Sequence, residues 1–148
     1  VRDGRDIAAS LIARAWKDPR SGKVFDYCAS AEGAARYWKG LARFGLSIER
    51  TLGGRVMRIR YEDLAMSGEA TLRAACAFLE EPYTDDMLRF HRRALDLAGV
   101  EIESEAALKE PLGARFVGRA VRELDRDQIG RIENIAGAEL AAFGYLPK

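Results

Sequence analysis

The sequence predicts a helix-rich α/β chain, and this prediction depends on two kinds of periodicity and on composition. Apolar residues recur every three or four positions over residues 31–52, as on one face of a long helix. Residues 55–61 instead alternate between apolar and basic side chains, which is typical of a half-exposed strand. The chain has 148 residues, 48% hydrophobic and 32% charged, a composition typical of a globular protein. We therefore expect a single domain over residues 1–148.

The first half of the chain predicts two helices separated by a loop. Asp3 is the expected N-cap of a helix over residues 4–17, with Asp6 in the acidic position of a capping-box-like pair. Residues 18–29 are an expected loop. A second helix covers residues 31–52 and ends at Gly53-Gly54. Its expected inward-facing residues are Ala34, Tyr37, Trp38, Leu41, Phe44, Ile48 and Leu52.

The second half predicts the strand and three further helices. Ser67 is the expected cap of a helix over residues 68–80, and Thr84 the cap of the next one. Residues 97–118 are expected to be irregular, with a short helix near residues 104–108. The last helix begins with Asp125 and Gln128, spaced as a capping box, and ends at Gly144. Its apolar stripe consists of Ile129, Ile132, Ala136, Leu140 and Phe143.

Charge, hydropathy and cysteine content exclude several classes of protein. A net charge of +1 argues against a nonspecific nucleic-acid binder, which carries a strong basic excess. No apolar run approaches the roughly 20 residues of a membrane span. Cys28 and Cys76 are far apart and belong to no metal-binding motif, so we expect no metal and a reducing, cytoplasmic location.

The first ten residues have the features of an anion-binding pocket. Arg2 precedes the expected helix N-terminus, where backbone amides without partners attract anions. Ser10 lies about two turns into the helix and adds a hydroxyl donor. Residues 1–20 hold five basic and three acidic side chains, and residues 109–122 hold four basic and one acidic. These two segments could converge on one small polyanion, although solvated surface charge is the more common reason for such a pattern.

Residues 1–10 read Val-Arg-Asp-Gly-Arg-Asp-Ile-Ala-Ala-Ser, which resembles the 3′-phosphate-binding motif of the sulfotransferase family, V-R-(D/N)-P-(R/K)-D-V-A-x-S. Gly4 stands where that motif has proline. Further segments resemble the family in order, and the resemblance covers almost the whole chain. They are Tyr61-Glu62-Asp63-Leu64, Phe78-Leu79-Glu80-Glu81-Pro82-Tyr83, Met87-Leu88-Arg89-Phe90-His91, a glycine- and arginine-bearing loop over residues 112–120, and Phe143-Gly144-Tyr145. Ala120 replaces the tryptophan of bacterial members.

The resemblance implies which residues bind the donor nucleotide. Arg2 and Ser10 would contact the 3′-phosphate, together with Arg115 or Arg119, and Gly118 would let the backbone approach it. Tyr61 would lie against the nucleotide at the end of the expected strand. The donor would be 3′-phosphoadenylyl sulfate (PAPS), the product 3′,5′-ADP (PAP), and no metal would be needed. The acceptor would be a hydroxyl or amine of a small molecule, carbohydrate or lipid.

The resemblance also implies a fold and a missing half. The fold would be a P-loop-nucleotide-kinase-like three-layer sandwich with a parallel sheet, of which this chain is the helix-rich C-terminal portion. The family's 5′-phosphosulfate loop and general base precede the arginine–serine motif, and we find neither here. His91 lies downstream, so we assign no catalytic residue. We expect these residues alone to bind the adenosine 3′-phosphate end weakly and not to turn over.

Two other classes of function remain open. One is a nucleotide-dependent P-loop-type kinase half, which would prefer ATP to 3′,5′-ADP. The other is a noncatalytic helical interaction module, whose arginines would contact a protein surface and which would bind no nucleotide. The sequence names neither the acceptor nor the oligomeric state.

Overall fold

Helices dominate this chain, and the sheet that the sequence predicted is absent from the residues that the structure describes. The structure is a computed structural model that describes residues 1–92 and 109–147. It is 68% helical and 2% strand. Within the described residues, the strand-like pairing is an isolated antiparallel bridge between Lys17 and Val24. The predicted α/β three-layer sandwich with a parallel sheet is therefore wrong.

The alternating segment 55–61 does not form a strand, because no strand among residues 1–92 and 109–147 pairs with its backbone. Gly53–Arg55 forms a 3₁₀ turn, η1, and the extended backbone from Val56 to Arg60 joins no ladder. A strand is stabilised by hydrogen bonds to an adjacent strand, which alternation of side chains alone does not supply. The basic side of the segment has another use, since Arg58 binds the Glu49 carboxylate and donates to the Ala142 carbonyl at 3.2 Å.

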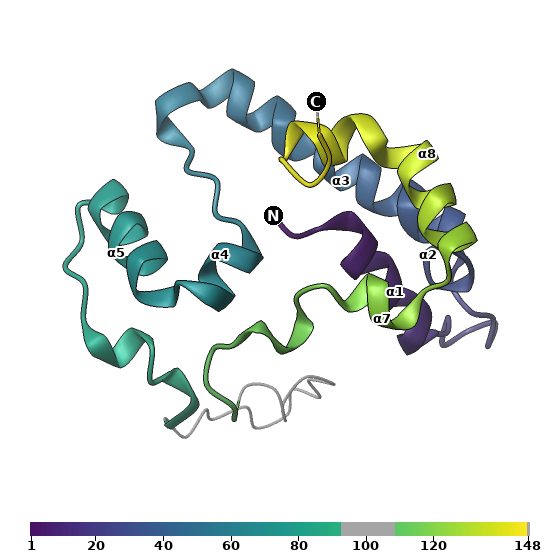
Figure 1. Ribbon diagram of the computed structural model, residues 1–148, viewed down its shortest axis with the longest axis horizontal. Coiled ribbons are helices and arrows are strands. Elements are labelled where there is room, and N and C mark those ends of the chain that lie inside the picture. Colours follow the sequence, from purple (N-terminus) through teal and green to yellow (C-terminus); the bar gives the residue numbers. More distant parts are fainter. Residues whose placement is uncertain (93–108, 148) are drawn as a thin grey trace. The chain divides into compact units, whose positions relative to one another are not determined.

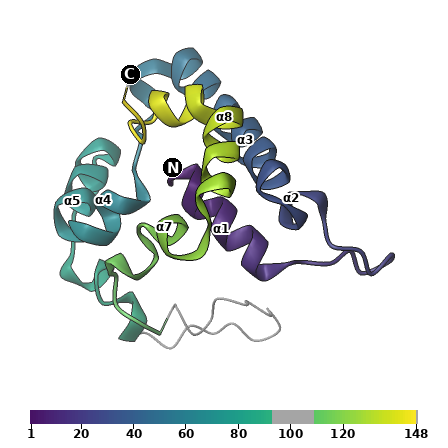
Figure 2. The same cartoon turned by 45° about the vertical axis from the view of Figure 1, so that its right-hand side comes forward.

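The chain divides into two compact units, which we describe separately. Unit 1 comprises Val1–Arg58 and Phe116–Lys148, and unit 2 comprises Ile59–Arg115. The main helices of unit 1 are α1 (Gly4–Arg14), α2 (Asp26–Ala29), α3 (Ala31–Leu52), α7 (Arg119–Glu123) and α8 (Arg126–Ala142). Within this unit, α3 and α8 lie side by side, and α1 contacts α3, α7 and α8 (Figure 1, Figure 2).

The long helix predicted over residues 31–52 is confirmed as α3. The Ser30 hydroxyl caps it by accepting a hydrogen bond from the Gly33 amide at 3.1 Å. Gly53 ends it with a positive φ of 53°, a conformation that glycine adopts without steric cost. Both ends of α3 are therefore set by groups within a few residues of them.

The face that α3 buries is not the one that its large apolar residues predicted. Ala34 and Trp38 are buried as expected, but four predicted inward residues are 38–65% exposed: Tyr37, Leu41, Phe44 and Leu52. The buried face consists mainly of small residues, which are Ala31, Gly33, Ala34, Ala35 and Ala42. At Gly33 a Cβ atom would lie 2.0 Å from the Asp26 carbonyl oxygen, so the close approach of α2 requires glycine. Close helix contact therefore selects the small-residue face.

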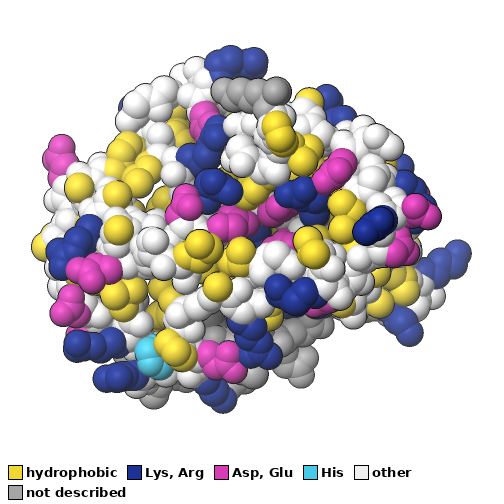
Figure 3. All heavy atoms as spheres, viewed as in Figure 1, with side chains coloured by type: hydrophobic (Ala, Val, Ile, Leu, Met, Phe, Trp, Pro, Cys, Tyr) yellow, Lys and Arg dark blue, Asp and Glu magenta, His cyan; other side chains and the backbone are white. Residues whose placement is uncertain are grey.

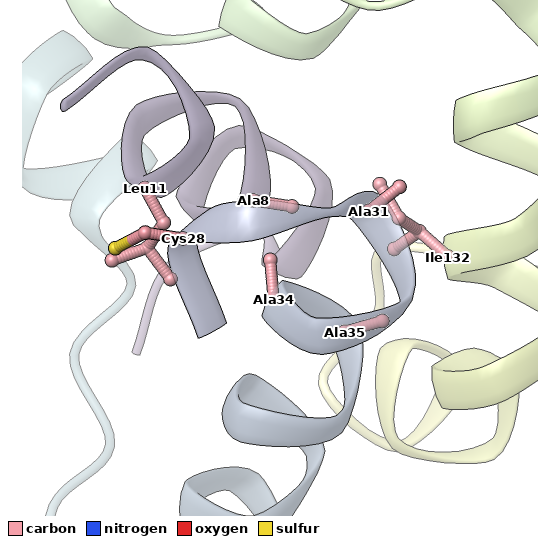
Figure 4. Packing of buried hydrophobic residues seen from close by; sticks show 7 residues of the cluster. All are labelled: Ala8, Leu11, Cys28, Ala31, Ala34, Ala35 and Ile132. Carbon is pink, nitrogen blue, oxygen red and sulfur yellow. The ribbon is translucent and has the colours of Figure 1, made fainter. Parts of the chain in front are cut away.

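The core of unit 1 joins these small residues to the apolar stripe of α8. Figure 4 shows one cluster of buried side chains, which consists of Ala8, Leu11, Cys28, Ala31, Ala34, Ala35 and Ile132. A second cluster consists of Trp38, Ala42, Ala136, Leu140 and Phe143. The buried Glu139 carboxylate is held at the same interface by the Arg43 guanidinium at 2.6 Å. The predicted inward positions 132, 136, 140 and 143 are confirmed.

The ends of α1 and α8 show how local groups stop and start helices. The predicted capping box of α8 is confirmed, since the Asp125 carboxylate and the Gln128 amide side chain each bond the other's backbone. Helix α1 ends at Arg14, three residues earlier than predicted. Ala15 adopts a left-handed conformation there, with φ of 46°, and its amide donates to the Leu11 carbonyl at 3.2 Å.

The described part of unit 2 contains short helices and turns. They are α4 (Tyr61–Met66), α5 (Gly68–Leu79), the 3₁₀ turns η2 (Asp85–Met87) and η3 (Phe90–Arg92), and the start of η4 (Ala114–Phe116). Helix α5 agrees with the prediction to one residue, although Ser67 makes no side-chain capping bond. In place of the helix predicted after Thr84, the chain forms the two 3₁₀ turns η2 and η3. The short helix predicted near residues 104–108 lies outside the described residues.

Candidate functional site

The first turn of α1 is held by hydrogen bonds and ion pairs within unit 1. Asp3 is the N-cap, as predicted, and accepts a hydrogen bond from the Arg5 amide at 2.9 Å. The Arg5 guanidinium also binds the Asp3 carboxylate, the Glu133 carboxylate of α8 at 2.7 Å and the Tyr145 carbonyl at 3.0 Å. The Asp3 carboxylate raises the pKa of Arg5 above its ordinary value, and the effect of burial is opposite and smaller. Arg5 therefore anchors α1 to the C-terminal part of unit 1.

Gly4 is explained by packing against α3. A Cβ atom at this position would lie 2.6 Å from the Trp38 ring, which real Cβ contacts do not reach. The same indole donates its Nε1 hydrogen to the Arg2 carbonyl at 3.1 Å. The indole therefore lies directly against the first turn of α1 and holds the backbone of Arg2 in place.

The Arg2 side chain points from the start of α1 towards the segment before α7. Its guanidinium donates to the Phe116 carbonyl and lies 3.8 Å from a carboxylate oxygen of Asp6. The side chain is only 18% exposed. Arg2 is therefore positioned by Asp6 of its own segment and by Phe116, which lies 114 residues further along the chain.

Asp6 has a different role from the one that its spacing predicted. It is buried, and its Oδ1 accepts a hydrogen bond from the Ala120 amide at 2.8 Å. In a capping box it would have reached back to the Asp3 amide instead. A buried carboxylate is stable only when it is hydrogen-bonded or paired with a charge, and Asp6 has both kinds of contact. It fixes the first turn of α7 against α1.

Ser10 of α1 and Arg119 of α7 contact each other. Arg119 Nη1 donates to Ser10 Oγ at 3.1 Å, which joins two segments that the family resemblance predicted to bind phosphate. Arg119 Nε also donates to both carboxylate oxygens of Glu123 at 2.7 Å. Gly118 precedes α7 with φ of 68°, so glycine is needed there for the turn that presents Arg119.

Asp6 and Ser10 are four residues apart and share one face of α1, and Arg2, which precedes the helix, brings its guanidinium to within 3.8 Å of Asp6. We call Arg2, Asp6, Ser10, Arg119 and Glu123 the arginine cluster. Asp6 and Glu123 were missed as members, and the signals that could have found them are Asp6's fourth-residue spacing from Arg2 and Glu123's from Arg119. In the cluster two guanidinium groups face two carboxylates. Figure 3 shows the same intermingling of basic and acidic side chains on the face drawn there.

Two predicted site residues belong to unit 2. Tyr61 opens α4 and does not follow a strand, so the predicted position at a strand end is wrong. Arg115 binds both oxygens of the Glu110 carboxylate, at 2.9 and 2.7 Å, and both side chains are more than half exposed. His91, to which we assigned no role, lies in η3 with its ring edge-to-face with Phe90.

Residues 1–92 and 109–147 contain no group of three or more His, Cys, Asp or Glu side chains that could hold a metal ion. No helix in the same ranges combines the length and apolar character needed to cross a bilayer. Cys28 and Cys76 are both buried and both free thiols.

Comparison with known proteins assigns no family to this chain. Neither a scan against protein-family models nor a search of curated proteins found a match.

Proposed function

We propose that this chain takes part in sulfuryl transfer from PAPS to a hydroxyl or amine acceptor, and that the arginine cluster binds the 3′-phosphate of the donor. The observation that supports this most directly is the hydrogen bond from Arg119 to Ser10. Arg2 and Ser10 come from one segment that resembles the family motif and Arg119 from another, 109 residues away from Ser10. Contact between them is what a shared phosphate site requires.

The donor groups of the cluster suit a phosphate monoester. Arginine matches the oxygens of phosphate with a planar fork of N–H donors. A serine hydroxyl can accept from one partner while it donates to another. Ser10 can therefore keep its bond from Arg119 and donate its own hydrogen to a phosphate oxygen. Asp6 holds the backbone of α7 in place by accepting the hydrogen bond of the Ala120 amide.

Positioning and charge neutralisation account for most of the catalysis of such in-line transfers. Arg2 and Arg119 would contribute to both when they hold the far end of the donor. PAPS supplies the transferred sulfuryl group. We assign no proton transfer to residues of this chain. We also propose a cytoplasmic location, since Cys28 and Cys76 are free thiols, as in a reducing compartment.

The test is nucleotide binding by calorimetry, with 3′,5′-ADP, 5′-AMP and ATP as ligands. Wild type should prefer 3′,5′-ADP, and Arg2→Ala and Ser10→Ala should lose that preference. Loss of one hydrogen bond to a charged group costs about 1.5–3 kcal/mol, or roughly tenfold to a hundredfold in affinity. Arg131→Ala is the matched control, because it removes a guanidinium of the same unit that pairs with Glu32.

A preference for ATP would favour the kinase alternative. A helical interaction module is the second candidate function, and the specific observation in its favour is that the described residues fold as helices without a sheet. An interaction module should bind none of the three nucleotides, and the Arg2 and Ser10 variants should then give the same result as wild type. Either result would contradict the proposed phosphate site.

A further inference from the structure

The Arg119 guanidinium already binds a carboxylate in this structure. Its Nε lies 2.7 Å from both oxygens of Glu123, while Nη1 donates to Ser10. Carboxylate and phosphate are alternative partners for the same edge of a guanidinium. A phosphate that approaches Arg119 therefore meets a group that competes for the same donors.

The two carboxylates of the arginine cluster differ in how easily they can leave. Asp6 is 2% exposed and accepts the Ala120 amide at 2.8 Å, so moving it would leave a buried amide without a partner. The Glu123 side chain is 39% exposed and can swing into water. Glu123 is also the last residue of α7, four positions after Arg119. Its departure would break only a single-turn ion pair.

We propose that Glu123 competes with the ligand's phosphate for Arg119 and so sets the affinity of the site, an inference that rests on the proposed function. A phosphate monoester carries a charge of about −1.5 to −2 and three acceptor oxygens, so it can displace a single carboxylate. An anion with a smaller charge gains less from the exchange. Because its carboxylate must first be displaced, Glu123 would lower the affinity of the site for the 3′-phosphate.

The experiment compares binding of 3′,5′-ADP and 5′-AMP to wild type, Glu123→Gln and Glu133→Gln at low ionic strength. Glu133→Gln is the matched control, because Glu133 also pairs with an arginine of unit 1, Arg5, at 2.7 Å and is 33% exposed. We expect Glu123→Gln to bind 3′,5′-ADP about threefold more tightly, since partly exposed ion pairs have modest energies. The affinity of Glu123→Gln for 5′-AMP should equal that of wild type. The affinity of Glu133→Gln for 3′,5′-ADP should also equal that of wild type.

The outcomes separate this inference from the proposed function. If wild type binds 3′,5′-ADP through Arg2 and Ser10 but Glu123→Gln is no tighter, the competition is overturned and the phosphate site stands. If neither wild type nor Glu123→Gln binds 3′,5′-ADP, the competition and the proposed phosphate site are both overturned. Glu123→Ala should repeat the gain of Glu123→Gln, and its far-ultraviolet circular dichroism should match wild type. A gain that appears equally with 5′-AMP would also overturn the competition, because it would not depend on the 3′-phosphate.

Discussion

Units 1 and 2 both form helices, but only unit 1 buries large apolar side chains within its described residues. Its clusters include Trp38, Ile132 and Leu140, all at most 5% exposed. In the described part of unit 2 the buried apolar residues are small: Ala65 and Cys76. Four of its larger apolar side chains are 38–68% exposed: Met66, Phe78, Leu79 and Met87. Helices can thus form with the same local signals whether or not they bury a core.

This difference has a consequence for the arginine cluster. Arg2, Asp6, Ser10, Arg119 and Glu123 all lie in unit 1, where packing determines their positions. Trp38, which lies in the second buried cluster, holds the Arg2 carbonyl. Arg115, a predicted site residue of unit 2, pairs with Glu110 where both side chains are more than half exposed. The better-packed unit therefore holds the better-defined candidate site.

The largest expected effect comes from truncating a core residue of unit 1. Ile132 is fully buried, and Ile132→Ala should lower the free energy of unfolding by about 3 kcal/mol through lost burial and a new cavity. Leu79 in α5 is 65% exposed, so Leu79→Ala should change stability by less than about 0.5 kcal/mol. Urea denaturation of both variants measures the difference. Equal losses would break the comparison between the units.

A smaller effect is expected at the helix caps. Asp125 accepts the Gln128 amide at 2.7 Å at the start of α8, so Asp125→Ala should cost about 1 kcal/mol. Ser67 occupies the same position at the start of α5 but makes no side-chain capping bond. Ser67→Ala should therefore leave the thermal midpoint almost unchanged. A similar loss in both variants would show that a capping bond forms at Ser67 in solution.

The smallest change in the free energy of unfolding is expected at surface ion pairs. The direction in which this change varies with pH follows from the pKa of the carboxylate. The hydrogen bond from Arg58 lowers the pKa of Glu49 below its ordinary value. A lowered carboxyl pKa stabilises the folded state above the ordinary pKa, and this stabilisation is lost as the pH falls through the folded value. Glu49→Gln should thus cost less than about 1 kcal/mol at neutral pH and nothing in acid.

The matched pair in unit 2 is Glu69 with Arg73, whose side chains are 58% and 56% exposed. Glu69→Gln should give no measurable change at either pH, because solvent screens such a pair. Stability measured from neutral to acidic pH on both variants tests this. An equal pH dependence in both variants would show that burial in unit 1 does not strengthen the Glu49–Arg58 pair.

The sequence by itself determined the features that depend on groups a few residues apart. It predicted the limits of α3, the N-cap at Asp3, the capping box of Asp125 and Gln128, and the stop at Gly144. Each of these is a hydrogen bond or a backbone conformation closed within about one helical turn.

Only the tertiary structure decided features that depend on distant neighbours. Periodicity could not show that α3 buries its small residues in place of Phe44 and Leu41, because either face is apolar enough for a core. Alternation over residues 55–61 could not supply a partner strand. The spacing of Asp6 predicted a helix capping box, but its carboxylate accepts a hydrogen bond from the amide of Ala120, 114 residues away. A buried polar group takes the partner that folding brings to it, which local sequence does not name.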